Sequence, residues 1–166
     1  MQKQVILLNG PSSSGKSTLS QALQNQIKEI RNEKYTVVSI DDFMKLAMDE
    51  TIYEDDVFEI SGDMCKAVLD AMKICDGVII DHVITSERIF NQLKSMLEQY
   101  RIYLVHVTCP LDVLKKREQE RKNRCLGSAQ ASYTYLFPKT GYDLVVDTHD
   151  ITPTDATIII IKEFFK

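Results

Sequence analysis

The chain has 166 residues, of which 44% are hydrophobic, so it can form one domain with a sizeable core without disulfides or metal. Its net charge of −4 argues against a nucleic-acid partner, because binding a phosphate backbone needs a basic face. The four cysteines show no C-x-x-C spacing and predict neither a zinc cluster nor a disulfide framework. No apolar run reaches the roughly 18 residues of a membrane span, and the first strand begins too early for a signal peptide. We therefore expect a cytoplasmic protein without a membrane partner.

The first predicted element is a buried strand over residues 4–9, and a phosphate-binding pattern follows it directly. The pattern G-x-x-x-x-G-K-[ST] leads into a helix predicted over residues 16–31. Such a turn directs successive backbone N–H groups and the positive end of the helix dipole at one point, where they bind an anion. Lys16 would reach the β- and γ-phosphates, and Ser17 would bind Mg²⁺. The residues predicted to hold the phosphates are Gly10, Pro11, Ser12, Ser13, Ser14, Gly15, Lys16, Ser17 and Thr18.

Along the rest of the chain, β-rich apolar runs alternate with helical patterns. Further strands are predicted over residues 35–40, 77–81, 102–107 and 143–147, and further helices over 57–75, 86–99, 111–123 and 153–165. This alternation predicts an α/β fold of the P-loop NTPase type, with a five-stranded parallel sheet and helices on both faces. Residues 1–166 form one domain in this interpretation. Irregular segments are expected near 48–56 and 124–141, where a substrate flap and a lid could lie.

Two acidic residues, Asp41 and Asp42, follow the second predicted strand directly. Ligands of an open parallel sheet bind beyond the carboxyl ends of its strands, so these carboxylates lie where chemistry is expected. One of them is interpreted as the N-cap of a short helix that begins near Phe43. The other would face the γ-phosphate and accept a proton from a substrate hydroxyl.

The third and fifth strands also end in aspartates. Asp81 ends an apolar run as a Walker-B aspartate does and is predicted to hold Mg²⁺, with a helix cap as the alternative. His82 follows it, where motor ATPases have a glutamate that activates water, so the pair favours transfer over hydrolysis; the role of His82 itself stays open. Asp147, followed by Thr148, is expected to cap a turn rather than to bind the nucleotide.

A basic stripe lies on the helix that begins near Leu111. Arg117, Arg121 and Arg124 are spaced i, i+4 and i+7 and share one helix face. Guanidinium groups on a rigid helix can clamp the oxygens of a migrating phosphoryl group, although a solvated helix face is the alternative. The stripe runs into a segment that contains Gly127, which predicts a lid over about residues 121–132.

Together these residues resemble the chloramphenicol phosphotransferase family over nearly the whole chain. The resemblance rests on the form LNG-x-SS-x-GKS of the phosphate loop, the aspartates after two strands, the basic segment and Y-D-x-x-V-D-T at residues 142–148. It implies a fold like that of nucleoside monophosphate kinases, and transfer of the γ-phosphate of ATP to a small-molecule hydroxyl. It also implies that Asp41 is the catalytic base and that residues 117–124 contact the nucleotide.

The acceptor stays open at this stage. Residues 135–139 lack the histidine that family members often have before Tyr-Asp, and the acidic residues between 49 and 59 would suit either an amine-bearing substrate or a solvated surface. The alternatives are a nucleoside or nucleoside monophosphate kinase and a non-catalytic nucleotide-binding regulator. A GTPase would need an N-K-x-D motif, and the chain has none. The sequence does not indicate an oligomeric state.

Overall fold

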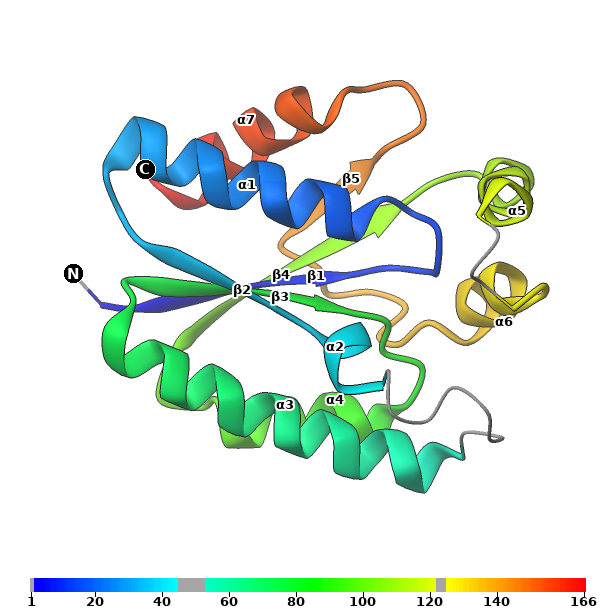
Figure 1. Ribbon diagram of the computed structural model, residues 1–166, viewed down its shortest axis with the longest axis horizontal. Coiled ribbons are helices and arrows are strands. Elements are labelled where there is room, and N and C mark those ends of the chain that lie inside the picture. The colour runs from blue at the N-terminus through cyan, green and yellow to red at the C-terminus, as the bar shows by residue number, and fades with distance from the viewer. Residues whose placement is uncertain (1, 45–52, 122–124) are drawn as a thin grey trace.

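The computed structural model describes residues 2–44, 53–121 and 125–166, and its centre is one parallel sheet (Figure 1). The strands lie in the order β2-β3-β1-β4-β5, and every neighbouring pair is parallel. Their bounds are β1 Gln4–Asn9, β2 Tyr35–Ser39, β3 Gly77–His82, β4 Arg101–Thr108 and β5 Leu144–Asp147. The predicted fold class is therefore confirmed, and the phosphate loop leaves the central strand of the sheet.

Helices cover both faces of this sheet and one of its ends. Helices α1 and α7 pack on one face and α3 and α4 on the other, while α2, α5 and α6 lie toward the carboxyl ends of the strands (Figure 1). Their bounds are α1 Lys16–Arg31, α2 Ile40–Met44, α3 Glu54–Ile74, α4 Glu87–Met96, α5 Leu111–Glu120, α6 Ser128–Tyr135 and α7 Pro153–Phe164. No helix within the described ranges is both long and apolar enough to cross a membrane.

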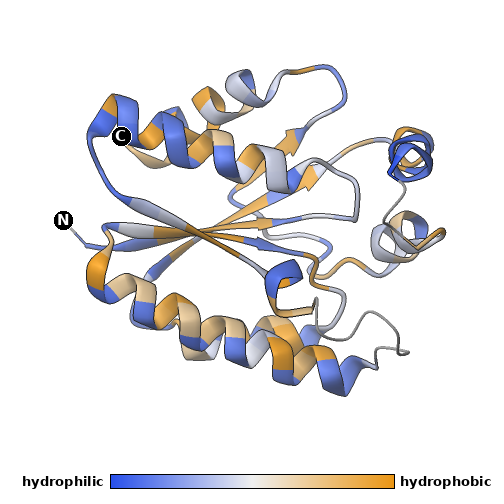
Figure 2. Ribbon diagram, in the orientation of Figure 1, coloured by the Kyte–Doolittle hydropathy of each residue, from blue (hydrophilic) through white to orange (hydrophobic). Residues whose placement is uncertain are grey.

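The hydrophobic core is divided by the sheet into two halves. Because side chains alternate along a strand, Val5 and Leu7 of β1 join the cluster under α3 and α4, whereas Ile6 and Leu8 join the cluster under α1 and α7. All four are fully buried, and burying each such side chain contributes roughly 1.5–3 kcal/mol. Figure 2 shows the hydrophobic strands between helices that are polar on their outer sides. The end of β1, where the phosphate loop starts, is thus held from both faces.

The absence of a side chain at Gly10 allows the start of the phosphate loop to pass close to the backbone of β4. A Cβ atom at this position would lie 2.0 Å from the backbone oxygen of Val107, a distance that no side chain tolerates. Five residues later Gly15 adopts a φ of 90°, in the left-handed region that favours glycine, and α1 begins at Lys16. The two glycines of the motif therefore serve a close approach and a backbone reversal.

Helix α6 corrects the expectation of an irregular segment over residues 124–141. Helix α6 is held by another helix: the buried carboxylate of Glu118 in α5 accepts hydrogen bonds from the N–H groups of Gly127 and Ala129, at 3.1 and 2.8 Å. The local sequence of residues 124–141 does not reveal this contact. This carboxylate satisfies amide groups that would otherwise be orphaned at the start of α6. Helices α5 and α6 therefore form one connected unit.

Candidate active site

The phosphate loop is a compact turn whose lysine lies over it. The N–H of Ser14 donates to the carbonyl oxygen of Pro11 at 3.2 Å, and Nζ of Lys16 donates to the same oxygen at 3.0 Å. Ser13 and Gly15 both have positive φ, of 69° and 90°. Such turns direct backbone N–H groups into a concave anion site. The loop therefore has the geometry that the sequence pattern predicts.

Ser17 and Asp81, the two residues predicted to bind a metal, are brought into direct contact. The Ser17 hydroxyl donates to Oδ2 of Asp81 at 2.8 Å, and Ser39 at the end of β2 donates to the same oxygen at 3.4 Å. A serine hydroxyl beside a carboxylate offers the hard oxygen ligands that Mg²⁺ takes alongside phosphate oxygens and water. The donor set therefore fits Mg²⁺. The capping alternative for Asp81 is wrong, because β3 continues to His82 and Ser86 caps α4 by accepting a hydrogen bond from Ile89 N–H.

Asp41 lies in the same small cavity as Lys16, Asp81 and Arg121. The prediction that one of the two aspartates caps a helix near Phe43 is wrong: α2 begins at Ile40, so both aspartates lie in its first turn. The Asp41 N–H is instead bound by the Ser39 hydroxyl, at 3.3 Å. The two aspartates differ in exposure, since Asp42 is exposed whereas Asp41 is half-buried. Asp41 is therefore the carboxylate with access to the phosphate loop.

Arg117 and Thr148 bind each other and the backbone carbonyl groups of the phosphate loop. Its Nη1 donates to Thr148 Oγ1 at 3.0 Å and to the Ser13 carbonyl at 3.4 Å, and its Nη2 donates to the Thr148 carbonyl at 3.1 Å. Thr148 Oγ1 in turn donates to the carbonyl oxygen of Ser14 at 2.7 Å. Thr148 thus supports the phosphate loop, a role beyond the turn cap predicted for Asp147 and Thr148. Asp147 caps a turn as expected, by accepting from the His149 N–H at 2.8 Å.

Of the other two arginines of the stripe, the structure describes only Arg121. Arg121 lines the small cavity with Asp41 and also a second cavity of about 430 Å³ between α1, α5 and the loop after β5. This second cavity is shared with Arg117, Thr148 and Pro153 and is large enough for a nucleoside. Arg124 lies outside the described residues.

A family model for chloramphenicol phosphotransferase-like proteins matches residues 3–165. The chain belongs to this family. Among curated proteins, no sequence matches it significantly.

Several solved structures share the fold of this chain at low sequence identity. They include the APS kinase of Mycobacterium tuberculosis in complex with AMPPNP and APS, with a TM-score of 0.77, 16% identity and 99% of both chains covered. A gluconokinase from Sinorhizobium meliloti has a TM-score of 0.67 at 15% identity, over 98% of this chain and 95% of that chain. The tunicamycin resistance protein of Deinococcus radiodurans has a TM-score of 0.66 at 15% identity, over 97% and 95%. These similarities show the fold.

In this member of the family, His82 is a neutral link between β3 and α3. It is fully buried, and its Nε2 lies 3.1 Å from the Ser61 hydroxyl. Burial lowers the pKa of His82 to about 4, so the ring is uncharged near pH 7. A second buried polar residue, Asn9, joins the end of β1 to two loops, since its Nδ2 donates to the Phe137 carbonyl at 2.9 Å and its Oδ1 accepts from Ile84 N–H at 2.9 Å. Asn9 belongs to the LNG form of the phosphate loop, but no local pattern in the sequence predicts this linking role.

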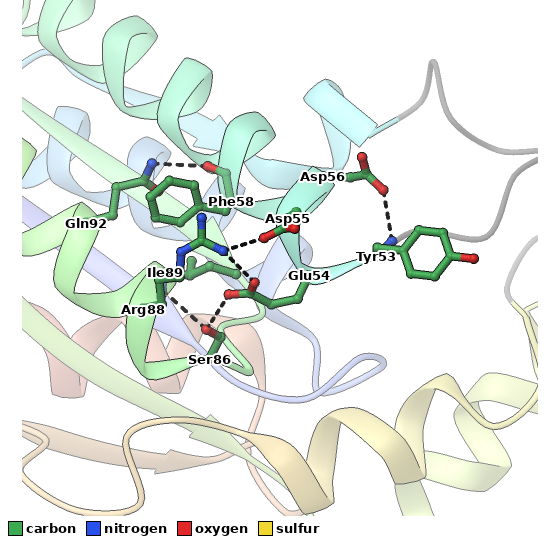
Figure 3. Close-up of polar contacts among 9 residues, drawn as sticks. All are labelled: Tyr53, Glu54, Asp55, Asp56, Phe58, Ser86, Arg88, Ile89 and Gln92. Carbon is green, nitrogen blue, oxygen red and sulfur yellow. Dashed lines mark hydrogen bonds and ion pairs between the residues drawn. The ribbon is translucent and has the colours of Figure 1, made fainter.

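The acidic residues at the start of α3 are engaged in contacts inside the protein. Arg88 of α4 pairs with Glu54 at 2.8 Å and with Asp55 at 2.5 Å, and its guanidinium lies over the Phe58 ring (Figure 3). Asp56 accepts a hydrogen bond from the Tyr53 N–H at 3.0 Å. These carboxylates therefore join α3 to α4 and cap α3. The acidic residues at positions 49 and 50 lie outside the described part of the chain.

Proposed function

We propose that this protein is a kinase that transfers the γ-phosphate of ATP to a hydroxyl group of a small molecule, with Mg²⁺. The observation that carries the proposal is one cavity at the end of the phosphate loop, lined by Lys16, Ser17, Asp41, Asp81 and Arg121. It combines an anion site, a metal-binding pair, a carboxylate and two cations, and these are the parts that phosphoryl transfer uses. Membership of the family supports the same activity.

In this proposal the nucleotide lies across the phosphate loop. The adenosine part would occupy the 430 Å³ cavity, and the phosphates would extend over the loop N–H groups toward Lys16. Arg117 and Thr148 would hold the loop in shape from outside. Ser17 and Asp81 would hold Mg²⁺, which neutralises charge on the β- and γ-phosphates when it is bound.

The proposed chemistry uses Asp41 as the base. Asp41 accepts the proton of the acceptor hydroxyl while the hydroxyl oxygen bonds to the γ-phosphorus, the bond to the β,γ-bridging oxygen breaks, and ADP leaves. Lys16 and Arg121 stabilise the charge on the oxygens of the migrating group. In this proposal His82 is not the base, because its ring is fully buried and is hydrogen-bonded to the Ser61 hydroxyl.

The proposed acceptor site is a hollow of about 370 Å³ between α6 and the start of α3. Its lining combines apolar surface with the hydroxyl-bearing residues Thr85, Ser128, Ser132 and Tyr135, and it also includes Glu54. Because Glu54 is already paired with Arg88, the site offers little net negative charge to an amine, and uncharged hydroxyl compounds suit it better.

The test is a transfer assay with ATP labelled at the γ-phosphate, over antibiotics, sugars, nucleosides and nucleoside monophosphates. The proposal expects label on a hydroxyl oxygen of one class of compound. Label on the phosphate of a nucleoside monophosphate would instead identify the monophosphate-kinase alternative. Tight ATP binding without transfer to any class would favour the regulatory alternative.

We further propose that the segment of about residues 121–132, of which the structure describes residue 121 and residues 125–132, acts as a lid. The small cavity of about 20 Å³ holds about one water molecule, so a phosphoryl group needs it to widen. Arg121, the first residue of the proposed lid, lines this cavity and lies outside the sheet, so its side chain can shift while the strands stay in place. Amide exchange in residues 125–132 should slow when AMPPNP and Mg²⁺ are added, whereas exchange in the core of α7 should not change. Equal exchange with and without nucleotide would contradict the lid.

A further inference from the structure

Two serine hydroxyls of the phosphate loop are buried without a protein partner. Oγ of Ser12 and Oγ of Ser13 have no hydrogen-bond partner among the described residues, and both side chains are at least nine-tenths buried. Leaving a buried hydroxyl unsatisfied costs about 1–3 kcal/mol, so such groups are rare in folded proteins. Two of them in one anion-binding loop indicate groups that are satisfied when a ligand is bound.

The surroundings of the two hydroxyls differ. Ser13 lines both the small cavity and the larger cavity assigned to the nucleoside. Ser12 lines only the small one, which it shares with Lys16, Asp41 and Asp81. Ser12 therefore lies at the far end of the phosphate chain, next to the group that is transferred.

Helix α6 fixes the orientation of Ser12. The Ser12 backbone N–H donates to Oγ of Ser132 at 2.9 Å, and this hydroxyl donates in turn to the carbonyl oxygen of Ser128 at 2.6 Å. Both ends of the contact are buried. Because α6 already occupies the backbone N–H of Ser12, the group that Ser12 can offer to a phosphate is its hydroxyl.

We propose that Ser12 is a catalytic residue whose hydroxyl donates a hydrogen bond to an oxygen of the γ-phosphoryl group, and that Ser132 is its positioning residue. The inference rests on the proposed function. The hydroxyl keeps its proton throughout and forms no covalent bond. Since ADP lacks the γ-phosphoryl group, the contact exists with ATP and during transfer but is lost in the product.

The test compares two nucleotides in the same variant. Wild type and Ser12→Ala are titrated calorimetrically with AMPPNP and with ADP, each with Mg²⁺. Removing a hydrogen bond to a charged group lowers affinity by about 10-fold or more. The AMPPNP dissociation constant of Ser12→Ala should therefore rise by at least about 10-fold. The ADP dissociation constant should change by less than about 2-fold, since the lost contact involves only the γ-phosphate.

Two further variants separate a catalytic role from a general loss of loop structure. Ser132→Ala should weaken AMPPNP binding selectively but less, and the double variant should be no worse than Ser12→Ala alone because both act through one contact. Thr157→Ala is the matched control: it removes another buried hydroxyl, which donates to Thr154 in α7, and should leave both dissociation constants unchanged.

Equal weakening of AMPPNP and ADP, or no weakening of either, would overturn the inference while leaving the proposed kinase in place. A wild-type protein that binds neither nucleotide would instead contradict the proposed function itself, and the inference with it.

Discussion

Replacing Lys16 by alanine is expected to reduce transfer of the γ-phosphate by about 10²-fold or more while leaving the fold intact. The ammonium group lies over the phosphate loop, 3.0 Å from the carbonyl oxygen of Pro11, where it would meet the phosphates. Losing one charge-stabilising group of an active site costs about 10²- to 10³-fold in rate. The check is the rate of label transfer from ATP, together with thermal unfolding.

Lys28→Ala is the matched control for this variant. It removes a lysine from the exposed part of the same helix, α1, away from the phosphate loop. Transfer by the Lys28 variant should stay within about 2-fold of wild type, because isolated surface charges contribute little. Unchanged turnover and unchanged ATP affinity in Lys16→Ala would remove the basis for assigning the phosphates to this loop.

Replacing Asp41 by asparagine is expected to lower the rate of transfer by about 10²- to 10⁴-fold, the range for a lost general base. The amide keeps the shape of the side chain but cannot accept the proton of the acceptor hydroxyl. ATP affinity should change little, since the carboxylate acts on the acceptor. Steady-state rates at saturating ATP, with the acceptor found by the labelled-ATP screen, measure the effect.

Asp42→Asn provides the comparison, since the two aspartates are neighbours in the first turn of α2 and differ in exposure. We expect its rate to stay within about 2-fold of wild type, as for other changes to exposed charges. A large loss in Asp42→Asn with a small one in Asp41→Asn would assign the base to Asp42. Full activity in both would exclude either aspartate as the base.

The parts of the fold that follow local rules could be predicted from the sequence. The five strands are apolar runs with β-branched residues, and the long helices repeat their apolar residues at helical spacing, so both signals lie within one element. The phosphate loop is also local, since Gly10, Gly15 and Lys16 lie within seven positions. These signals were sufficient for the fold class.

What the sequence did not reveal depends on contacts between distant segments. Helix α6 is short, and its first amides are bound by Glu118 of another helix. Thr148 reaches Ser14 across 134 positions, and Ser132 reaches Ser12 across 120. Such pairs leave no periodic signal in the sequence, so they appear only once the chain is folded.

The start of α2 differs from the predicted start near Phe43 for another reason. Ile40 is β-branched and follows a strand, so it resembled the last residue of that strand. In the structure it belongs to the helix and is buried in the cluster under α3 and α4. A strand and a helix would both bury the residue at position 40, so a single apolar residue cannot distinguish the two elements. Because α2 begins at Ile40 and not near Phe43, neither aspartate is at the position before the helix where an N-cap lies.

The most direct measurement of the central claim is phosphoryl transfer to an unbiased set of acceptors. The protein is incubated with Mg²⁺, ATP carrying ¹⁸O in its γ-phosphate and a small-molecule extract of cells, and mass spectrometry detects compounds that gain a labelled phosphate. A small-molecule kinase should produce such a compound with wild-type protein and about 10²-fold less of it, or none, with the Lys16→Ala variant. Formation of the same labelled compounds in equal amounts by both proteins, or of none by a wild-type protein that binds ATP, would contradict the claim.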